Sequence, residues 1–377
     1  MKIGILTYHK SINYGSVLQA WATKDLLERM GHSAEVIDYE PGALKDFYKL
    51  YSSGHGVKAL ARKVVRMPIA KIKKNQQRNF EVFRNRFLNL SSFTLGKNDD
   101  FKIIEDSYDW VICGSDQIWN VHAMDSDDIY FLPDVNVKKI ALSVSVNNTD
   151  FTEPRCNEEM KRWISDFDFL TCREESGAKK IAGFLEGKRE VRTFLDPTLM
   201  HNKEDFYPLC SGRVIKKPYI FLYKVWSGKD SYKLVSELGK KLNLPVYTMF
   251  MHNSMKELCM VESGGVKVIK KDTSPSDYLS LIRYADYVVT DSFHGTAFSL
   301  IFEKKFICVR EKDTKGRDKN DERILNILHV VGLDDRYIAL DSIFTYPISE
   351  KIDYSTVTDR RMRIANDNIS TLKKVIG

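Results

Sequence analysis

Polar residues that could take part in catalysis or binding follow four apolar runs of the sequence. These polar segments are residues 7–16, 114–120, 173–177 and 291–296, and each comes where a buried strand is expected to end. In an open parallel sheet, ligands bind beyond the carboxyl ends of the strands. Functional side chains are therefore expected in these four loops.

The last segment contains a histidine at a strand-to-helix junction. His294 follows the apolar run Tyr287–Thr290, and a helix is expected to start at Gly295 or Thr296. A helix amino terminus offers N–H donors to a phosphate, and a histidine, whose pKa is ordinarily near neutrality, can pair with an anion or act as a general acid. The alternative is a histidine that only caps a turn. The position between strand and helix favours the functional interpretation.

A second junction, Gly114-Ser115-Asp116-Gln117, also follows an apolar strand. The glycine would let the backbone approach a ligand, and Asp116 is placed to act on a hydroxyl group. An aspartate at this position is equally a common helix cap. Trp119 could stack on a sugar, although packing is the more common role of a tryptophan near a strand end.

Several common site types have no support in the sequence. No G-x-G-x-x-G or G-x-x-x-x-G-K-[ST] motif follows any strand, which argues against a dinucleotide oxidoreductase and an ATPase. The six cysteines include no C-x-x-C pair, so neither a disulfide framework nor a zinc cluster is indicated. We expect no metal and no cofactor.

The elements that position these loops predict an α/β protein with two Rossmann-like, doubly wound domains. A chain of 377 residues favours two cores. We predict an N-terminal domain over 1–210, a C-terminal domain over 211–350, and a helix within 351–377 that packs back toward the first domain. The predicted strands are Lys2–Thr7, Glu35–Tyr39, Trp110–Cys113, Ile140–Val146, Phe167–Cys172, Val191–Leu195, Tyr219–Val225, Val246–Phe250, Val266–Ile269, Tyr287–Thr290 and Phe306–Val309.

Positive charge is concentrated in one stretch of the first domain. The net charge is +7, and no acidic residue lies between Asp46 and Glu81. A basic amphipathic helical insert is expected at about 55–90, broken near Pro68. A solvated helix packed on its apolar side is the favoured interpretation, with binding to an anionic membrane surface or a phosphate-bearing acceptor as the alternative. Without a signal-like or membrane-spanning apolar run, the cytoplasm is the expected location.

Taken together, these segments resemble the polysaccharide pyruvyl transferase family, from the first strand to about residue 335. The likeness rests on several short motifs that occur in the same order along the chain. They are Ile5-Leu6-Thr7-Tyr8, Asn13 to Ala20, Val36-Ile37-Asp38-Tyr39, Gly114 to Asn120, Arg173-Glu174-Glu175-Ser176, Asp196-Pro197-Thr198, and Ala285-Asp286-Tyr287 through Ser292 to Ala297.

The resemblance implies a fold like that of GT-B glycosyltransferases, with two Rossmann-like domains facing a cleft. It implies phosphoenolpyruvate as the donor and a sugar of a bacterial cell-surface polysaccharide precursor, such as an exopolysaccharide or capsule, as the acceptor. The product would be a pyruvate ketal, with release of phosphate. The N-terminal domain would be the acceptor side and the C-terminal domain the donor side, and no nucleic-acid partner is expected.

By this resemblance, particular residues are assigned roles. The catalytic candidates are His294 and Asp116. The donor-binding candidates are Arg173, Ser292, Gly295, Thr296 and Lys224. The acceptor-binding candidates are Asn13, Tyr14, Gly15, Ser115, Gln117 and Trp119.

One position departs from the family pattern, because related members often carry an arginine where this chain has Ser292. Another cation would then compensate, and Lys224, Arg310 and Lys10 are the candidates. Two other functions stay open: a GT-B-type nucleotide-sugar glycosyltransferase, and a non-catalytic glycan-binding protein. The basic insert adds the expectation of a lipid-linked acceptor and peripheral contact with the inner membrane face.

Overall fold

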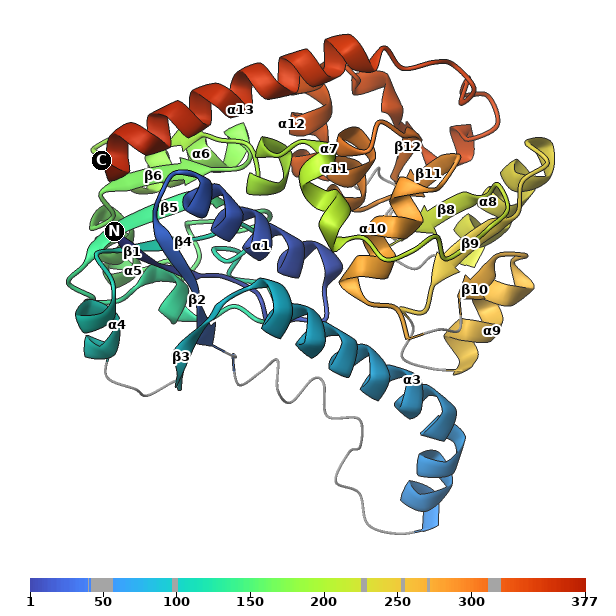
Figure 1. Cartoon of the computed structure of the whole chain (residues 1–377), viewed down its shortest axis with the longest axis horizontal. Helices are drawn as coiled ribbons and strands as arrows, with labels where there is room; N and C mark the ends of the chain where they lie inside the picture. The colour runs from blue at the N-terminus through green and yellow to red at the C-terminus, as the bar shows by residue number, and fades with distance from the viewer. Residues whose placement is uncertain are drawn as a thin grey trace. The chain divides into compact units, whose positions relative to one another are not determined.

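A computed structural model describes residues 1–39, 41, 57–96, 101–224, 229–251, 255–269, 272–310 and 320–377, with side chains except at 57–70, 229–230 and 255–256. The chain forms two compact units (Figure 1). The first comprises Met1–Lys49, Arg84–His201 and Arg361–Gly377, and the second Leu50–Phe83 and Asn202–Arg360. The division thus falls at 201/202 instead of the predicted 210/211.

The first unit is built on a seven-stranded parallel sheet in the order β3-β2-β1-β4-β5-β6-β7. Its strands are β1 (Lys2–Leu6), β2 (Ser33–Tyr39), β3 (Leu90–Leu95), β4 (Trp110–Cys113), β5 (Lys138–Val144), β6 (Phe169–Cys172) and β7 (Arg192–Thr193). Its helices are α1 (Tyr14–Arg29), α4 (Lys102–Ser107), α5 (Glu158–Ser165), α6 (Glu175–Phe184) and two short 3-10 helices, η1 (Asp128–Phe131) and η2 (Pro197–Met200).

The second unit repeats the plan with a six-stranded parallel sheet in the order β10-β9-β8-β11-β12-β13. Its strands are β8 (Ile220–Tyr223), β9 (Val246–Met249), β10 (Lys267–Ile269), β11 (Tyr287–Thr290), β12 (Lys305–Arg310) and β13 (Tyr337–Ala339). Its helices are α7 (Lys203–Phe206), α8 (Lys229–Lys241), α9 (Met255–Ser263), α10 (Pro275–Arg283), α11 (Phe293–Ile301) and α12 (Glu322–Val331). The predicted fold class, two doubly wound α/β domains, is confirmed.

Two long helices, α3 and α13, each have residues in both units. Helix α3 (Val57–Phe87) is one continuous helix, so Pro68 does not break it as predicted; a proline inside a long helix can be accommodated with a local kink. In the terminal helix α13 (Tyr354–Ile376), residues from Arg361 onward group with the first unit. There Arg361 donates to the carbonyl oxygens of Leu199 and His201, and the Asn368 side chain accepts from the Leu195 N–H.

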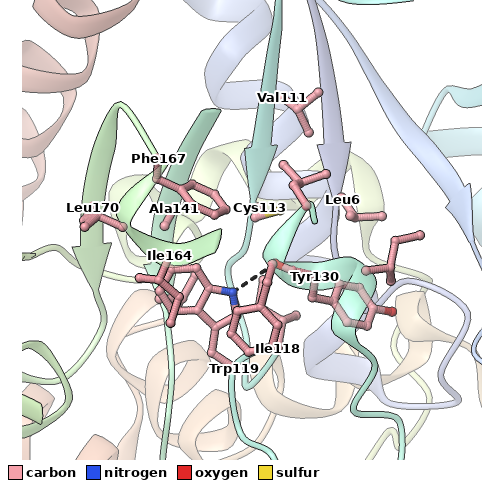
Figure 2. Close-up of a cluster of buried hydrophobic side chains, with 14 of the residues drawn as sticks. Leu6, Val111, Cys113, Ile118, Trp119, Tyr130, Ala141, Ile164, Phe167 and Leu170 are labelled. Atoms are coloured by element: carbon pink, nitrogen blue, oxygen red, sulfur yellow. Dashed lines mark hydrogen bonds between the residues drawn. The ribbon is translucent and has the colours of Figure 1, made fainter. Parts of the chain in front are cut away.

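The core of the first unit includes Trp119, which is only 1% exposed. Its indole ring stacks on Phe131 at 5.4 Å and meets Phe167 edge-on. Its Nε1–H donates to the Tyr130 carbonyl oxygen at 2.9 Å, the dashed line in Figure 2. Because the ring is enclosed and its polar atom satisfied, the acceptor contact predicted for Trp119 is wrong: the residue packs the core.

Both sheets have a switch point, where the strand order reverses. In the first unit it lies between β1 and β4, and in the second between β8 and β11. Chain segments leave neighbouring strands in opposite directions there, which opens a crevice at the carboxyl edge where ligands bind in such folds. The segment after β4 carries Asp116, and the segment after β11 carries His294, so each predicted catalytic residue follows a strand at a switch point.

Gly114 lets the chain leave β4 in close contact with the neighbouring strand. Its φ is +119°, and a Cβ atom there would lie 2.2 Å from the Leu142 carbonyl oxygen of β5. The close approach is therefore to the sheet backbone and not, as the sequence suggested, to a ligand. No other residue type fits this position without displacing backbone.

We expect Gly114→Ala to lower the free energy of unfolding by about 2 kcal/mol or more, since both the clash and the positive φ oppose the methyl group. Urea titration followed by fluorescence measures this. The matched control is Gly183→Ala, at a helical position with nothing within 4 Å of the added Cβ. This control should be neutral or slightly stabilising. Equal midpoints for wild type and Gly114→Ala would contradict the assignment.

Candidate functional site

In the first unit, the segments after β1 and β4 are tied together by a chain of hydrogen bonds. The Thr7 hydroxyl donates to the Ser115 carbonyl oxygen at 3.0 Å, and the Gln19 amide donates to Thr7 Oγ1 at 2.8 Å. The Ser115 N–H donates to Gln19 Oε1 at 3.0 Å. All three residues are buried, so this network fixes the backbone that presents the neighbouring Asp116.

Asp116 is held through both of its carboxylate oxygens. Ser16 Oγ donates to Oδ2 at 2.5 Å, and the Gln117 N–H donates to Oδ1 at 2.8 Å. The residue has φ +80° and is 5% exposed. Asp116 is therefore a fixed acceptor within the switch-point segment, and its Ser16 partner lies in the first turn of α1.

Arg173, which follows β6, lies between two carboxylates. Its Nη1 donates to Asp196 Oδ2 at 3.0 Å, and its Nη2 lies 3.9 Å from Asp116 Oδ1. Ser115 Oγ donates to the same Asp196 oxygen at 2.8 Å. A buried guanidinium requires such partners, since an unpaired charge in the interior is strongly destabilising. Arg173 thus belongs to the first unit, while the other predicted donor-binding residues belong to the second.

The predicted acceptor-binding residues of α1 begin the helix. Its N-cap is Asn13, whose Oδ1 accepts from the Gly15 N–H at 2.9 Å and the Ser16 N–H at 3.4 Å. Tyr14 and Gly15 are buried in the first turn, while Asn13 is exposed. Ser115 is fully buried, and its hydroxyl donates inside the unit. Asn13 therefore offers the most exposed side chain of this group.

Gln117 belongs to the same edge and is partly exposed. Its Oε1 accepts from Asn147 Nδ2 at 2.7 Å and from Asn120 Nδ2 at 3.1 Å. The two amide donors hold the Gln117 side chain in one orientation. Its position beside Asp116 is consistent with the predicted acceptor role, which stays a prediction.

Asp125, in the loop between β4 and η1, interacts electrostatically with Asp116, an interaction that the sequence analysis missed. Burial and, to a smaller extent, the charge of Asp116 raise the pKa of Asp125 to about 6. Burial and the same carboxylates raise the pKa of Tyr8 well above its usual range. Residues 125, 127 and 128 are aspartates in a polar loop, a pattern typical of a solvated turn, so no sequence signal distinguished Asp125.

In the second unit, the switch-point segment forms the start of α11. Ser292 is the N-cap, and its Oγ accepts from the Gly295 N–H at 3.5 Å. Its own N–H donates to Thr290 Oγ1 at 3.1 Å. His294 lies in the first helical turn and is 6% exposed. The first N–H groups of a helix have no acceptor within the helix, which suits this end for an anion.

Gly295 and Thr296 anchor the helix to the sheet. A Cβ atom on Gly295 would lie 2.2 Å from Thr290 Oγ1 and 3.1 Å from the Tyr223 ring, so only glycine permits this approach. The Thr296 hydroxyl is fully buried, 3.0 Å from both the Ser292 carbonyl oxygen and Cys308 Sγ. The side chain of Thr296 therefore holds the helix in place, and its predicted donor contact is not favoured by this geometry.

The three candidate cations differ in their surroundings. Lys224 directly follows β8, which pairs with β11, so it lies at the same edge as His294; its Nζ donates to Ser231 Oγ. Arg310, at the end of β12, donates to the Tyr337 carbonyl oxygen at 3.1 Å. Lys10 belongs to the first unit, where its Nζ lies 2.5 Å from Asp38 Oδ1. Lys224 and Arg310 thus both belong to segments next to β11, the strand that precedes His294, whereas Lys10 belongs to the other unit.

Comparisons with known structures support the fold. A UDP-GlcNAc 2-epimerase from Methanocaldococcus jannaschii matches with a TM-score of 0.53 and 13% identity, covering 97% of this chain and 99% of that one. A putative UDP-N-acetylglucosamine 2-epimerase from Listeria monocytogenes matches with a TM-score of 0.54 and 10% identity, covering 99% and 95%. At these identities the likeness shows a GT-B-type fold and nothing about substrate.

Comparison with protein families is more specific. No curated protein matches the chain. A family model described as polysaccharide pyruvyl transferase matches residues 13–313, a range that includes both switch-point segments and confirms the resemblance predicted from the motifs. The chain therefore belongs to the polysaccharide pyruvyl transferase family and is a transferase.

Proposed function

We propose that the protein transfers the pyruvyl group of phosphoenolpyruvate to a sugar of a bacterial cell-surface polysaccharide precursor, forming a pyruvate ketal and releasing phosphate. The observation that carries the proposal is the position of two family motifs. Gly114 to Asn120 and Ser292 to Ala297 each follow a strand at a switch point. Both motifs therefore lie where this fold class binds ligands.

The second unit is proposed to hold the donor. Phosphoenolpyruvate carries a phosphate and a carboxylate, and the edge around α11 offers a helix amino terminus with His294 in its first turn. Lys224 directly follows the neighbouring strand β8 and is proposed to supply a positive charge in place of the arginine that related members often carry at position 292. Helix dipole, imidazole and ammonium all favour a bound anion.

The first unit is proposed to hold the acceptor. Its switch point presents Asp116, Gln117 and the exposed Asn13, which are hydrogen-bonding groups suited to sugar hydroxyls. Ketal formation removes a proton from each of two hydroxyls, and a carboxylate close to the acceptor can receive such a proton as a general base. A donor-binding role for Arg173 stays a prediction, since its guanidinium already lies beside Asp196 and Asp116.

We expect His294→Ala to reduce turnover about 100-fold or more, because a general acid or phosphate ligand contributes on that order, while the fold stays intact. Purified protein is incubated with phosphoenolpyruvate and candidate saccharides, and phosphate release and the mass gain of the sugar are followed. The matched control is His329→Ala, which removes an exposed histidine of the same unit paired with Asp334. Wild-type activity in His294→Ala would refute the assigned role.

The same assay tests the proposed function itself. Phosphate release without a sugar product would argue against ketal formation. Stabilisation by nucleotide sugars, but not by phosphoenolpyruvate, in thermal-shift measurements would favour a glycosyltransferase on the same fold. Saccharide binding without any turnover would favour a glycan-binding protein.

We further propose that the protein is cytoplasmic and that α3 brings it to the inner membrane face, where a lipid-linked acceptor would be found. In the part of α3 whose side chains are described, residues 71–87, Gln76, Phe80 and Phe83 are buried. Arg86 and the acidic Glu81 are exposed further along the helix, and the exposed basic residues before them are Lys71, Lys74 and Arg78. At 100° per residue these form one stripe opposite the buried face, an arrangement suited to anionic headgroups. Among the described helices, none combines the length and apolarity needed to cross a bilayer.

Reversing the charge at Lys71, Lys74 and Arg78 to Glu should weaken co-sedimentation with phosphatidylglycerol vesicles about tenfold or more, since each basic residue near such a surface contributes about 1 kcal/mol. Lys73 is left unchanged, because it lies outside this stripe at 100° per residue and burial lowers its pKa. A triple reversal of the exposed Lys179, Lys188 and Arg192 serves as the charge-matched control. Equal loss in both variants would show only a net-charge effect and would count against a specific role for α3.

A further inference from the structure

We infer that Gln117 binds the acceptor through its side-chain N–H₂ group, as a hydrogen-bond donor, and that Asn120 is a positioning residue that holds the amide in this orientation. The inference rests on the proposed function, because it concerns how the first unit recognises the acceptor. It is argued from hydrogen bonds within that unit alone. Gln117 follows Asp116 in the segment after β4, at the switch point of the sheet.

The orientation of the Gln117 amide follows from a backbone group that can only donate. The His122 backbone N–H donates at 3.1 Å to the buried Asn120, so the Asn120 atom that faces it is the oxygen Oδ1. The other terminal atom of Asn120 is therefore the nitrogen Nδ2, which lies 3.1 Å from the Gln117 side chain. Because Nδ2 donates, the Gln117 atom that it contacts is the oxygen Oε1. The Gln117 N–H₂ group is thus turned away from Asn120.

Asn147 donates to the same oxygen from the loop after β5. Its Nδ2 lies 2.7 Å from Gln117 Oε1. This loop is fixed by the buried Glu174 carboxylate, whose Oε1 accepts from the Asn147 N–H at 3.2 Å and from Ser145 Oγ at 2.8 Å. Two donors from separate segments therefore hold the Gln117 oxygen on the side of the protein.

The group that this arrangement leaves for a ligand is the Gln117 nitrogen. Within the described part of the chain, the hydrogen bonds of the Gln117 side chain all go to Oε1, and the residue is partly exposed. An amide nitrogen donates hydrogen bonds and accepts none. The neighbouring Asp116 carboxylate accepts them. The segment thus places a donor beside an acceptor, a combination suited to a sugar, whose oxygens carry lone pairs and whose hydroxyls carry protons.

The kinetic test exchanges the donor for an acceptor with almost no change in side-chain shape. In Gln117→Glu, one carboxylate oxygen can still accept from Asn120 and Asn147, while the other replaces the N–H₂ group. We expect KM for the saccharide that forms product to rise about tenfold or more in Gln117→Glu and in Gln117→Ala, because the loss of one hydrogen bond to a substrate has an effect of this order. The kcat and the KM for phosphoenolpyruvate should be unchanged. A wild-type saccharide KM in either variant, or a fall in kcat alone, would overturn the inference and leave the proposed function standing.

A second measurement needs no substrate. The chain has four glutamines, so protein carrying ¹⁵N-labelled glutamine gives few side-chain N–H₂ signals in NMR, and that of Gln117 is assigned by its loss in Gln117→Glu. We expect the Gln117 N–H₂ group to exchange its protons with water quickly. The N–H₂ group of Gln19 should exchange slowly, because it is buried and donates to Thr7 Oγ1 and the Ser16 carbonyl oxygen. Equally slow exchange at Gln117 would show that its nitrogen faces the protein and would overturn the assigned orientation.

The variant Asn120→Asp tests the positioning role. The aspartate can still accept from the His122 N–H, but its second oxygen cannot donate to Gln117 and instead attracts the N–H₂ group, so the amide should turn. Proton exchange at the Gln117 N–H₂ group should then slow, and KM for the saccharide should rise as in Gln117→Glu. The matched control is Asn136→Asp, which adds the same charge at an exposed asparagine of the first unit and should change neither quantity.

The outcomes separate this inference from the proposed function. Unchanged exchange and unchanged KM in Asn120→Asp would overturn the positioning role of Asn120. A wild-type protein that forms no ketal with any saccharide would instead refute the proposed function, and with it the assignment of Gln117 to the acceptor.

Discussion

The first unit depends on a buried guanidinium placed between carboxylates that come from different strands. Arg173 follows β6, Asp116 follows β4, and Asp196 caps η2 after β7. A charge of this kind is tolerated in the interior only when partners are present at short distance, so the three loops must arrive together for the fold to be stable. The carboxyl edge of the sheet is therefore rigid where a ligand is proposed to bind.

The second unit fixes its site by packing instead of charge. Gly295 allows α11 to approach Thr290 and Tyr223 more closely than any side chain would permit, and the Thr296 hydroxyl closes the remaining space toward Cys308. The first turn of α11, with His294, is thereby held against the sheet. One unit thus presents a carboxylate-rich edge and the other a helix amino terminus with a histidine, a division that matches an acceptor hydroxyl and an anionic donor.

Among the strands that the structure describes, the sequence analysis missed two, β3 and β13. Central strands such as β4 and β11 appear as continuous apolar runs, whereas the edge strand β3 alternates partly exposed residues and β13 is three residues long. The strand-end motifs were found because they combine a local pattern with a position that the fold class makes meaningful.

What the sequence could not supply were contacts between distant residues. Ser16 and Asp116 are 100 residues apart, and the hydrogen bonds to both Asp116 oxygens follow only from the folded chain. The interaction of Asp125 with Asp116 was missed for the same reason, because it arises only in the folded chain. A carboxyl group whose pKa is raised by burial and by a neighbouring charge destabilises the native state progressively as the pH rises from the ordinary aspartate pKa to the raised value, because the unfolded chain loses the proton first.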